Sequence, residues 1–188
     1  PYSAKTRWYL THRGLLGKDV HPHLLSIKKN IHSKLGFVVL PVVHGPGGDV
    51  LQDSTVIIDE LEARHPGNPI RPNGGAELVL DRLLELFGDE WMPIISMHTR
   101  WNTPENAKFA IEEIGRNALP WFPGFLQRRV GRTMGKKLAG YLPLLGIRPE
   151  TEEEIDSLFS ELLRILESIL ETRPYLLGSH PCVGDFSI

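Results

Sequence analysis

The residues with the most distinctive chemistry lie between positions 40 and 54. Pro41 interrupts a stretch of β-branched residues, a glycine-rich turn follows it, and Asp53-Ser54 then opens a segment with helical spacing. A helix N-terminus presents free N–H groups and partial positive charge, which suit a carboxylate. Ser54 adds a hydroxyl donor and Asp53 adds an anion, so the pair could hold the carboxylate and the ammonium of an amino-acid head group. Asp and Ser are also the commonest helix N-caps, and plain capping is the simpler interpretation of the pair alone.

Few other side chains suggest a reactive site. Two histidines, as in His21-Pro22-His23, are more typical of a surface loop than of a metal site, so we expect no bound metal. Cys182 is the single cysteine, which excludes a disulfide scaffold. We expect it to be a partly buried residue at a helix start rather than a nucleophile.

A basic segment covers residues 120–142. Apolar residues recur there at intervals of four, and five Lys or Arg residues lie among them without an acid. Such a segment could touch anionic lipid, but a solvated helix that covers a core is the commoner structure, and we expect that. Gly131 and Gly135 would loosen this helix, which could then act as a mobile lid.

The composition is that of a globular protein. Hydrophobic residues make up 41% and charged residues 23% of the 188 residues, which excludes a disordered or collagen-like chain. The formal net charge of −2 gives no overall sign of nucleic-acid binding. No apolar run approaches the ~20 residues that span a bilayer. The single cysteine and the lack of a signal peptide fit a reducing cytosol, so we expect a cytoplasmic protein without membrane contact.

Local patterns predict the elements that would position the candidate residues. We expect a first helix over 3–13, a strand over 37–43 with a return strand over 50–52, and a helix from Asp53 to His65. Residues 67–75 are rich in Gly, Pro and Asn and predict a linker. The chain beyond them carries only helical patterns, with a break near Gly88 and Pro93 and a capping box at Thr151.

Four motifs in this order resemble the glutathione S-transferase family. Residues 1–10 (PYSAKTRWYL) resemble its first helix, and residues 40–43 (LPVV) resemble its turn with a cis-proline. Residues 50–62 (VLQDSTVIIDELE) resemble its signature around the glutathione site, with Asp53 where Glu or Gln is usual. Residues 175–186 (YLLGSHPCVGDF) resemble its helix-capping motif, with Cys182 in place of a Ser or Thr.

The resemblance implies an α/β thioredoxin-like N-terminal domain followed by an all-α helical domain. The boundaries would be residues 1–70 for the glutathione-binding domain, 71–75 for the linker and 76–188 for the helical domain. The chain begins at Pro1 without a methionine, and we expect a fragment that lacks the first strand and the last helices.

The resemblance also implies the site residues. Leu40 would pair its backbone with the cysteinyl part of glutathione, Pro41 would be the cis residue, and Asp53 and Ser54 would hold the γ-glutamyl group. The catalytic residue would lie immediately before Pro1, outside the sequence. Within the sequence the candidate is Ser3, for which a helix cap is the more usual role. The electrophile pocket would use a second group of residues, His98, Arg100 and Trp101.

The function implied is that of a glutathione transferase, which adds glutathione thiolate to small apolar electrophiles and needs glutathione as co-substrate but no metal. Two alternatives stay open: a non-enzymatic binding or assembly module of the same fold, and a glutathione-dependent isomerase or ether-cleaving enzyme. No nucleic-acid partner is expected. A homodimer is left open by analogy with the family.

Overall fold

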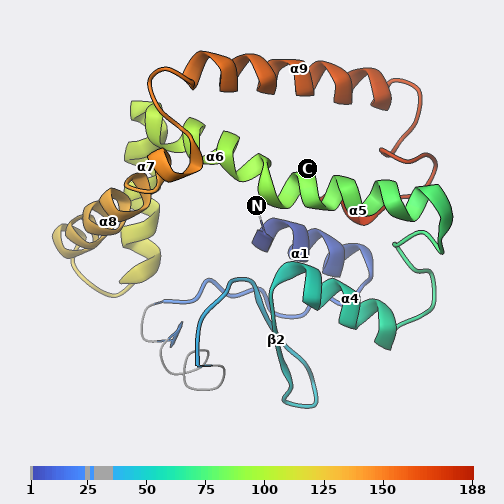
Figure 1. The fold of residues 1–188 in the computed structure, drawn as a ribbon. Helices are drawn as coiled ribbons and strands as arrows, with labels where there is room; N and C mark the ends of the chain where they lie inside the picture. Colours follow the sequence, from blue (N-terminus) through green and yellow to red (C-terminus); the bar gives the residue numbers. More distant parts are fainter. Residues whose placement is uncertain (1, 24–25, 28–35) are drawn as a thin grey trace. The chain divides into compact units, whose positions relative to one another are not determined.

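The computed structural model describes residues 2–23, 26–27 and 36–188 (Figure 1). Within these residues it has two short strands, and its other elements are helices. The N-terminal elements are α1 (Tyr2–His12), β1 (Val42–His44), β2 (Val50–Gln52) and α4 (Ser54–Arg64). Helices alone follow: α5 (Gly75–Glu90), α6 (Met92–Asn102), α7 (Pro104–Ala118), α8 (Gly124–Ala139), the 3-10 helix η2 (Leu142–Leu145), α9 (Glu152–Leu170) and α10 (Val183–Ser187). This order agrees with the α/β part followed by a helical part that the sequence predicts.

The chain forms two compact units. The first comprises described residues within 1–18, 38–93 and 160–188, and the second those within 19–37 and 94–159. Helix α5 therefore belongs to the same unit as α1, although it begins where the predicted linker ends. The domain boundary expected at residues 71–75 stays a prediction.

The core of the first unit lies where α1, α4 and α10 meet. Its buried residues are Tyr9, Leu10, Ile57, Ile58, Leu61, Ile70 and Val183. Helices α1 and α4 lie side by side in Figure 1, and α5 packs against α10. Glycine makes that last contact close, because a Cβ at Gly88 would overlap the backbone of Ser187. The motif around Asp185 is also confirmed, since its Oδ2 accepts a hydrogen bond of 2.8 Å from the Cys182 N–H at the start of α10.

The two strands form an antiparallel hairpin with Val42 opposite Gln52. The turn closes through a hydrogen bond of 2.9 Å from Gly45 N to Asp49 O. The strand predicted over 37–43 is wrong at its start, because β1 begins only after Pro41. Proline has no N–H to donate to a ladder, which explains why pairing starts at the next residue.

A buried ionic cluster connects the helices of the first unit. Lys5 is 1% exposed, and its Nζ donates to Glu85 Oε1 at 2.8 Å and to Asp89 Oδ2 at 2.7 Å. Arg71 forms ion pairs with Asp59, Asp81 and Glu85 at 2.7 to 3.0 Å. We call these residues, together with Arg82, the Lys5 cluster. It holds α1, α4, α5 and the segment before α5 together.

The charges of this cluster shift the pKa of Glu85. Burial alone would raise that pKa, but the hydrogen bond from Lys5 and the charge of Arg71 outweigh it. The pKa of Glu85 is therefore held below its usual range, and Glu85 is ionised in the folded protein at neutral pH. The sequence alone did not indicate this cluster.

In the second unit α7 packs against α8 through glycines. A Cβ at Gly131 would overlap the backbone oxygen of Ile111, and one at Gly115 would overlap the backbone oxygen of Gln127. Gly131 and Gly135, which we expected to loosen α8, are buried contact positions. Gly131 allows the backbones of α7 and α8 to approach, and Gly135 leaves room for the side chains of Ile111 and Trp101.

The start of α9 also differs from the prediction. The Thr151 hydroxyl does not cap the helix; it donates to the carbonyl of Gly146 at 2.7 Å and accepts from Arg148 N at 3.0 Å. It therefore fixes the turn before the helix instead of completing a capping box.

Candidate functional site

The open end of the hairpin brings the predicted residues of the first unit together. The register of the two strands has Val42 opposite Gln52, so one further step places Pro41 opposite Asp53. The side chain of Gln52 also reaches across, because its Oε1 accepts a hydrogen bond of 3.2 Å from Val39 N. The Leu40–Pro41 peptide bond is cis, as the resemblance implies. Leu40 and Ser54 therefore flank the same end of one hairpin.

The N-terminus of α4 is held by the Asp53 side chain. Asp53 Oδ1 accepts hydrogen bonds from Thr55 N at 3.0 Å and from Val56 N at 3.2 Å. Both bonds use one carboxylate oxygen, so Oδ2 takes no part in capping. The first helical bond runs from Ile57 N to Asp53 O. Among the hydrogen bonds of the described residues, this leaves the N–H of Ser54 as the group of the first turn without an acceptor.

The backbone of Asp53 is unusual in itself. Its φ of 76° and ψ of 129° lie in a region that residues other than glycine rarely adopt. Such a conformation costs on the order of 1–3 kcal/mol and persists where the surroundings fix it. Here it exposes the carboxylate while Ser54, the next residue, is 4% exposed. Among the described residues, this helix end therefore has one carboxylate oxygen, Asp53 Oδ2, outside the capping bonds and one N–H group, that of Ser54, without an acceptor.

The first turn of α1 also lies near the N-terminus of α4. The Tyr2 hydroxyl donates to the carbonyl of Asp89 at 2.7 Å. Partial burial raises the pKa of Tyr2, and the charges of Asp89, Glu90 and Asp53 raise it further. Tyr2 therefore lies within electrostatic reach of Asp53 and keeps its proton at neutral pH.

Ser3 lies in the exposed first turn of α1 and not at the cap position before it. The cap role that we considered for Ser3 is therefore wrong. Its hydroxyl is accessible at the helix end that approaches Asp53. A catalytic role of Ser3 stays a prediction.

Sequence reasoning missed the support of this region from α5. Thr55 Oγ1 donates to Glu85 Oε1 at 3.0 Å, and Asp89 accepts from Lys5 as well. These carboxylates are about 30 residues or more away from the hairpin in the sequence, and no local pattern could have indicated the contact. Glu85 and Asp89 share one side of α5 at a spacing of four, which is the signal that the sequence did contain.

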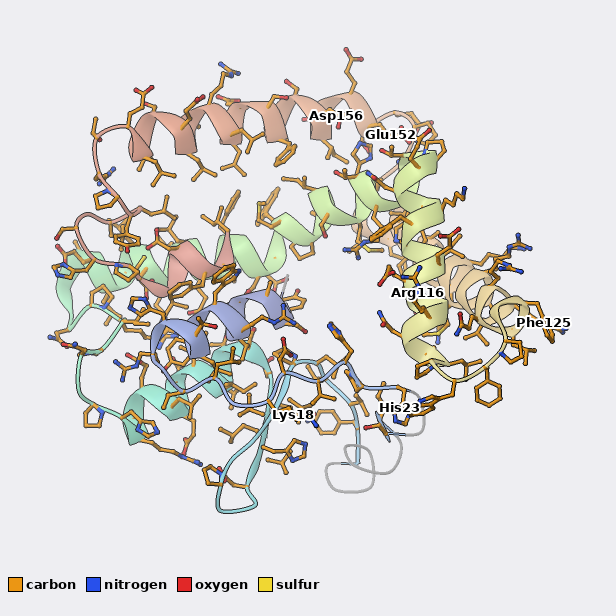
Figure 2. The ribbon with its side chains drawn as sticks, turned by 180° about the vertical axis from the view of Figure 1, so that it is seen from behind. Lys18, His23, Arg116, Phe125, Glu152 and Asp156 are labelled. Atoms are coloured by element: carbon orange, nitrogen blue, oxygen red, sulfur yellow. The ribbon has the colours of Figure 1, made fainter. Side chains whose placement is uncertain are left out.

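The residues predicted for the electrophile pocket lie in the second unit. His98 is 6% exposed, and its Nε2 lies 3.1 Å from Asp156 Oδ1. Asn102 Nδ2 donates to Glu152 Oε1 at 2.9 Å and lies 3.1 Å from His98 Nδ1. Because an amide N–H₂ only donates, Nδ1 accepts and Nε2 carries the proton toward Asp156. Figure 2 shows Glu152 and Asp156 on the first turns of α9.

The other two residues of this group differ from His98. Arg100 is exposed on α6, and Trp101 is half-buried against α8, where a Cβ at Gly135 would lie 3.3 Å from its Cζ3. The Trp101 Nε1–H is buried without a hydrogen-bond partner among the described residues. It is a donor that a ligand could satisfy. This group and the hairpin group belong to different compact units, and both stay predicted sites.

Cys182 is buried at the start of α10. Burial raises its pKa well above the usual range, and the hydrogen bond with Asp185 raises it further. Cys182 is therefore a thiol at neutral pH. No group of three or more His, Cys, Asp or Glu residues in the described part of the chain is arranged to hold a metal ion. None of the described helices is long and apolar enough to cross a membrane.

A cavity of about 1000 Å³ lies elsewhere in the first unit. It is lined by His12, residues 68–75 and residues 177–182 with the exception of Gly178, together with Glu77. None of the predicted glutathione-binding residues lines it. The hairpin end is therefore a separate region from this cavity.

The N-terminal part of the chain is similar to a known family. Residues 1–69 match the family described as glutathione S-transferase, N-terminal domain. No protein with a curated description matches the sequence. With this match, the antiparallel strand pair and the helices after it confirm the predicted fold: a thioredoxin-like domain followed by a helical domain.

Solved structures with partial similarity include Gtt2 from Saccharomyces cerevisiae. Its sequence identity is 16%, the match covers 100% of this chain and 77% of that chain, and the TM-score is 0.48. A glutathione transferase family member from Pseudomonas fluorescens Pf-5, with bound glutathione, has 19% identity. That match covers 86% of this chain and 89% of the other, with a TM-score of 0.44.

Proposed function

We propose that this chain, a glutathione S-transferase-like protein by its N-terminal domain, binds reduced glutathione at the open end of the hairpin and transfers its thiolate to small apolar electrophiles. The observation that carries the proposal is the N-terminus of α4, where Ser54 keeps a free N–H beside the carboxylate of Asp53. Glutathione would be a co-substrate, and no metal is needed for this reaction.

The γ-glutamyl end of glutathione matches these groups in charge. Its carboxylate would accept hydrogen bonds from the N–H and hydroxyl of Ser54, at the positive end of α4. Its ammonium would donate to Asp53 Oδ2, the oxygen that the cap leaves unused. The backbone of Leu40 lies outside the described strand pair and would bond to the cysteinyl part, beside the cis-proline Pro41.

The reaction requires glutathione as a thiolate. A thiol with a pKa near 8.5 is only about 3% ionised at pH 7, and a hydroxyl or N–H donor increases this fraction by stabilising the anion. The thiolate would then form a bond from sulfur to carbon, and the displaced electron pair would move to the electrophile or its leaving group. Tyr2 already donates to Asp89 O, so Ser3 or the residue before Pro1 would stabilise the thiolate.

The second substrate would bind near His98, Arg100 and Trp101. The unpartnered Nε1–H of Trp101 supports this assignment, because it could donate to a polar group of an otherwise apolar molecule. A cytoplasmic location, a role in detoxification and a homodimer belong to the proposal as well. The alternative of a non-enzymatic binding module is favoured by the exposed basic surface of α8.

The proposal is tested by calorimetric titration of glutathione. Asp53→Asn keeps an oxygen that can cap α4 but removes the charge that faces the ammonium. Loss of one charged hydrogen bond, worth about 1.5–3 kcal/mol, should weaken binding roughly 10- to 150-fold.

The matched control is Asp49→Asn, which removes a half-buried carboxylate in the hairpin turn that pairs with Arg64. Its glutathione affinity should equal that of the wild type. Equal affinity of folded Asp53→Asn and wild type would remove the assignment of the site. If the folded wild type does not bind glutathione, the protein has this fold but not this ligand.

A further inference from the structure

The surface around α8 is strongly basic. Between residues 114 and 149 the sequence has no Asp or Glu. It has seven bases there: Arg116, Arg128, Arg129, Arg132, Lys136, Lys137 and Arg148. The five bases of α8 itself are exposed, and none forms an ion pair with any described residue. No carboxylate of the described residues therefore lies within ion-pair distance of these five bases.

Helical spacing places several of these residues in one row. Phe125, Arg129, Arg132 and Lys136 follow one another at steps of four, three and four, which align on one face of a helix. All four are exposed, whereas Gly131 and Gly135 occupy the other face against α7. Figure 2 shows Phe125 at the start of α8. The outer face of α8 thus begins with an aromatic ring and continues with positive charge.

Exposed apolar side chains lie at both ends of this helix. Trp121 precedes the helix and is 73% exposed, and Phe125 in its first turn is 63% exposed. Leu144 after it is 81% exposed. The solvated helix expected from the sequence accounts for the bases, since Leu126, Val130 and Leu138 are half-buried as a covering helix requires. It does not account for large apolar side chains left in water beside them.

We propose that the outer face of α8, with Trp121 and Phe122 before it, docks on a bilayer that contains anionic lipid. The bases would lie at the lipid phosphates, and the aromatic rings would enter the boundary between headgroups and acyl chains. A bilayer offers both environments side by side, in the order in which the helix presents them. Phe and Leu side chains gain nothing from a purely polyanionic partner, whereas lipid removes them from water.

This inference is independent of the proposed glutathione site. The α8 surface belongs to the second compact unit, and Leu40, Pro41, Asp53 and Ser54 belong to the first. A failure to bind glutathione would leave it unaffected. It replaces the expectation, drawn from the sequence, of a solvated helix without membrane contact.

The test is flotation of the purified protein with two kinds of vesicle. One contains phosphatidylcholine alone, and the other contains equal parts of phosphatidylcholine and phosphatidylserine. We expect binding to the second kind, loss of this binding in high salt, and a blue shift of fluorescence that Trp121→Phe removes. Each base near a charged surface contributes roughly a fivefold factor. The double variant Arg129→Glu/Arg132→Glu should therefore bind at least about 25-fold more weakly.

The matched control is Arg164→Glu/Arg173→Glu, which changes the net charge equally at two exposed positions outside this surface. It should bind vesicles like the wild type. The proposal is overturned if the wild type binds neither vesicle at low salt, or if both double variants lose binding equally. Binding of a single-stranded RNA in place of vesicles, lost in Arg129→Glu/Arg132→Glu, would overturn it in favour of nucleic acid.

Discussion

Replacing Lys5 by methionine tests the buried ionic cluster of the first unit. Methionine has a similar length and no charge, so Lys5→Met removes the charge with little change in volume. Lys5 is 1% exposed and bonded to Glu85 and Asp89, whose side chains are 5% and 16% exposed. With three bases and four acids, the Lys5 cluster would go from a formal charge of −1 to −2.

The expected loss follows from the burial of the partners. Removing one partner of a buried pair costs about 3–5 kcal/mol, because the other charge is left without compensation. For a chain of this size that loss lowers the melting temperature by roughly 6–20 °C. The assay is thermal unfolding followed by circular dichroism, with urea denaturation as a second measurement of the free energy of unfolding.

Arg82→Met is the matched control, because Arg82 belongs to the same cluster but its side chain is 44% exposed. An exposed pair contributes about 0–1 kcal/mol, so this variant should melt within a few degrees of the wild type. The double variant Lys5→Met/Asp89→Asn restores the formal charge of −1 and should recover part of the stability. Equal losses in Lys5→Met and Arg82→Met would refute the argument that burial makes Lys5 critical.

Three further predictions follow from single residues. The pKa of Glu85 is lower in the folded than in the unfolded protein, so its stabilising contribution is full above about pH 4.3 and is lost as the pH falls through the folded pKa. In Glu85→Gln the free energy of unfolding, measured with urea, should therefore depend less on pH in that acidic range. An unchanged dependence on pH would contradict this. Cys182 should resist iodoacetamide at pH 8 until urea unfolds the protein, because its pKa is raised, and rapid labelling of the native protein would show that the thiol is accessible. Gly131→Ala should cost about 1–3 kcal/mol in urea denaturation because its Cβ meets the backbone of Ile111, while Gly124→Ala should be neutral or stabilising; equal effects would exclude the close helix contact.

The sequence predicted the elements of the N-terminal part because their signals are local. Gly14 has the positive φ expected after a helix end, and α4 begins immediately after Asp53 as its capping residues indicate. The hairpin followed from the turn residues between Val43 and Val50. The strand before Pro41 was overestimated, because β-branched residues favour strands only where a partner is available.

Long-range contacts set the limit of the sequence prediction. The pairing of Lys5 with Asp89 joins residues 84 positions apart, and no spacing rule connects them. The two glycines of α8 looked like weak points, since glycine lowers helix propensity. Only the position of α7 shows that they are contact points.

The glutathione site at the N-terminus of α4 is tested most directly by a titration of glutathione into ¹⁵N-labelled protein, followed residue by residue by NMR. We expect the amide signals of Leu40 and Ser54 to shift until they reach saturation, while the signal of Gly131 in the second unit stays in place. In Asp53→Asn the same shifts should require a higher glutathione concentration. Saturable shifts that leave Leu40 and Ser54 unchanged, or no shifts at any concentration, would contradict the assignment of the α4 N-terminus as the glutathione site.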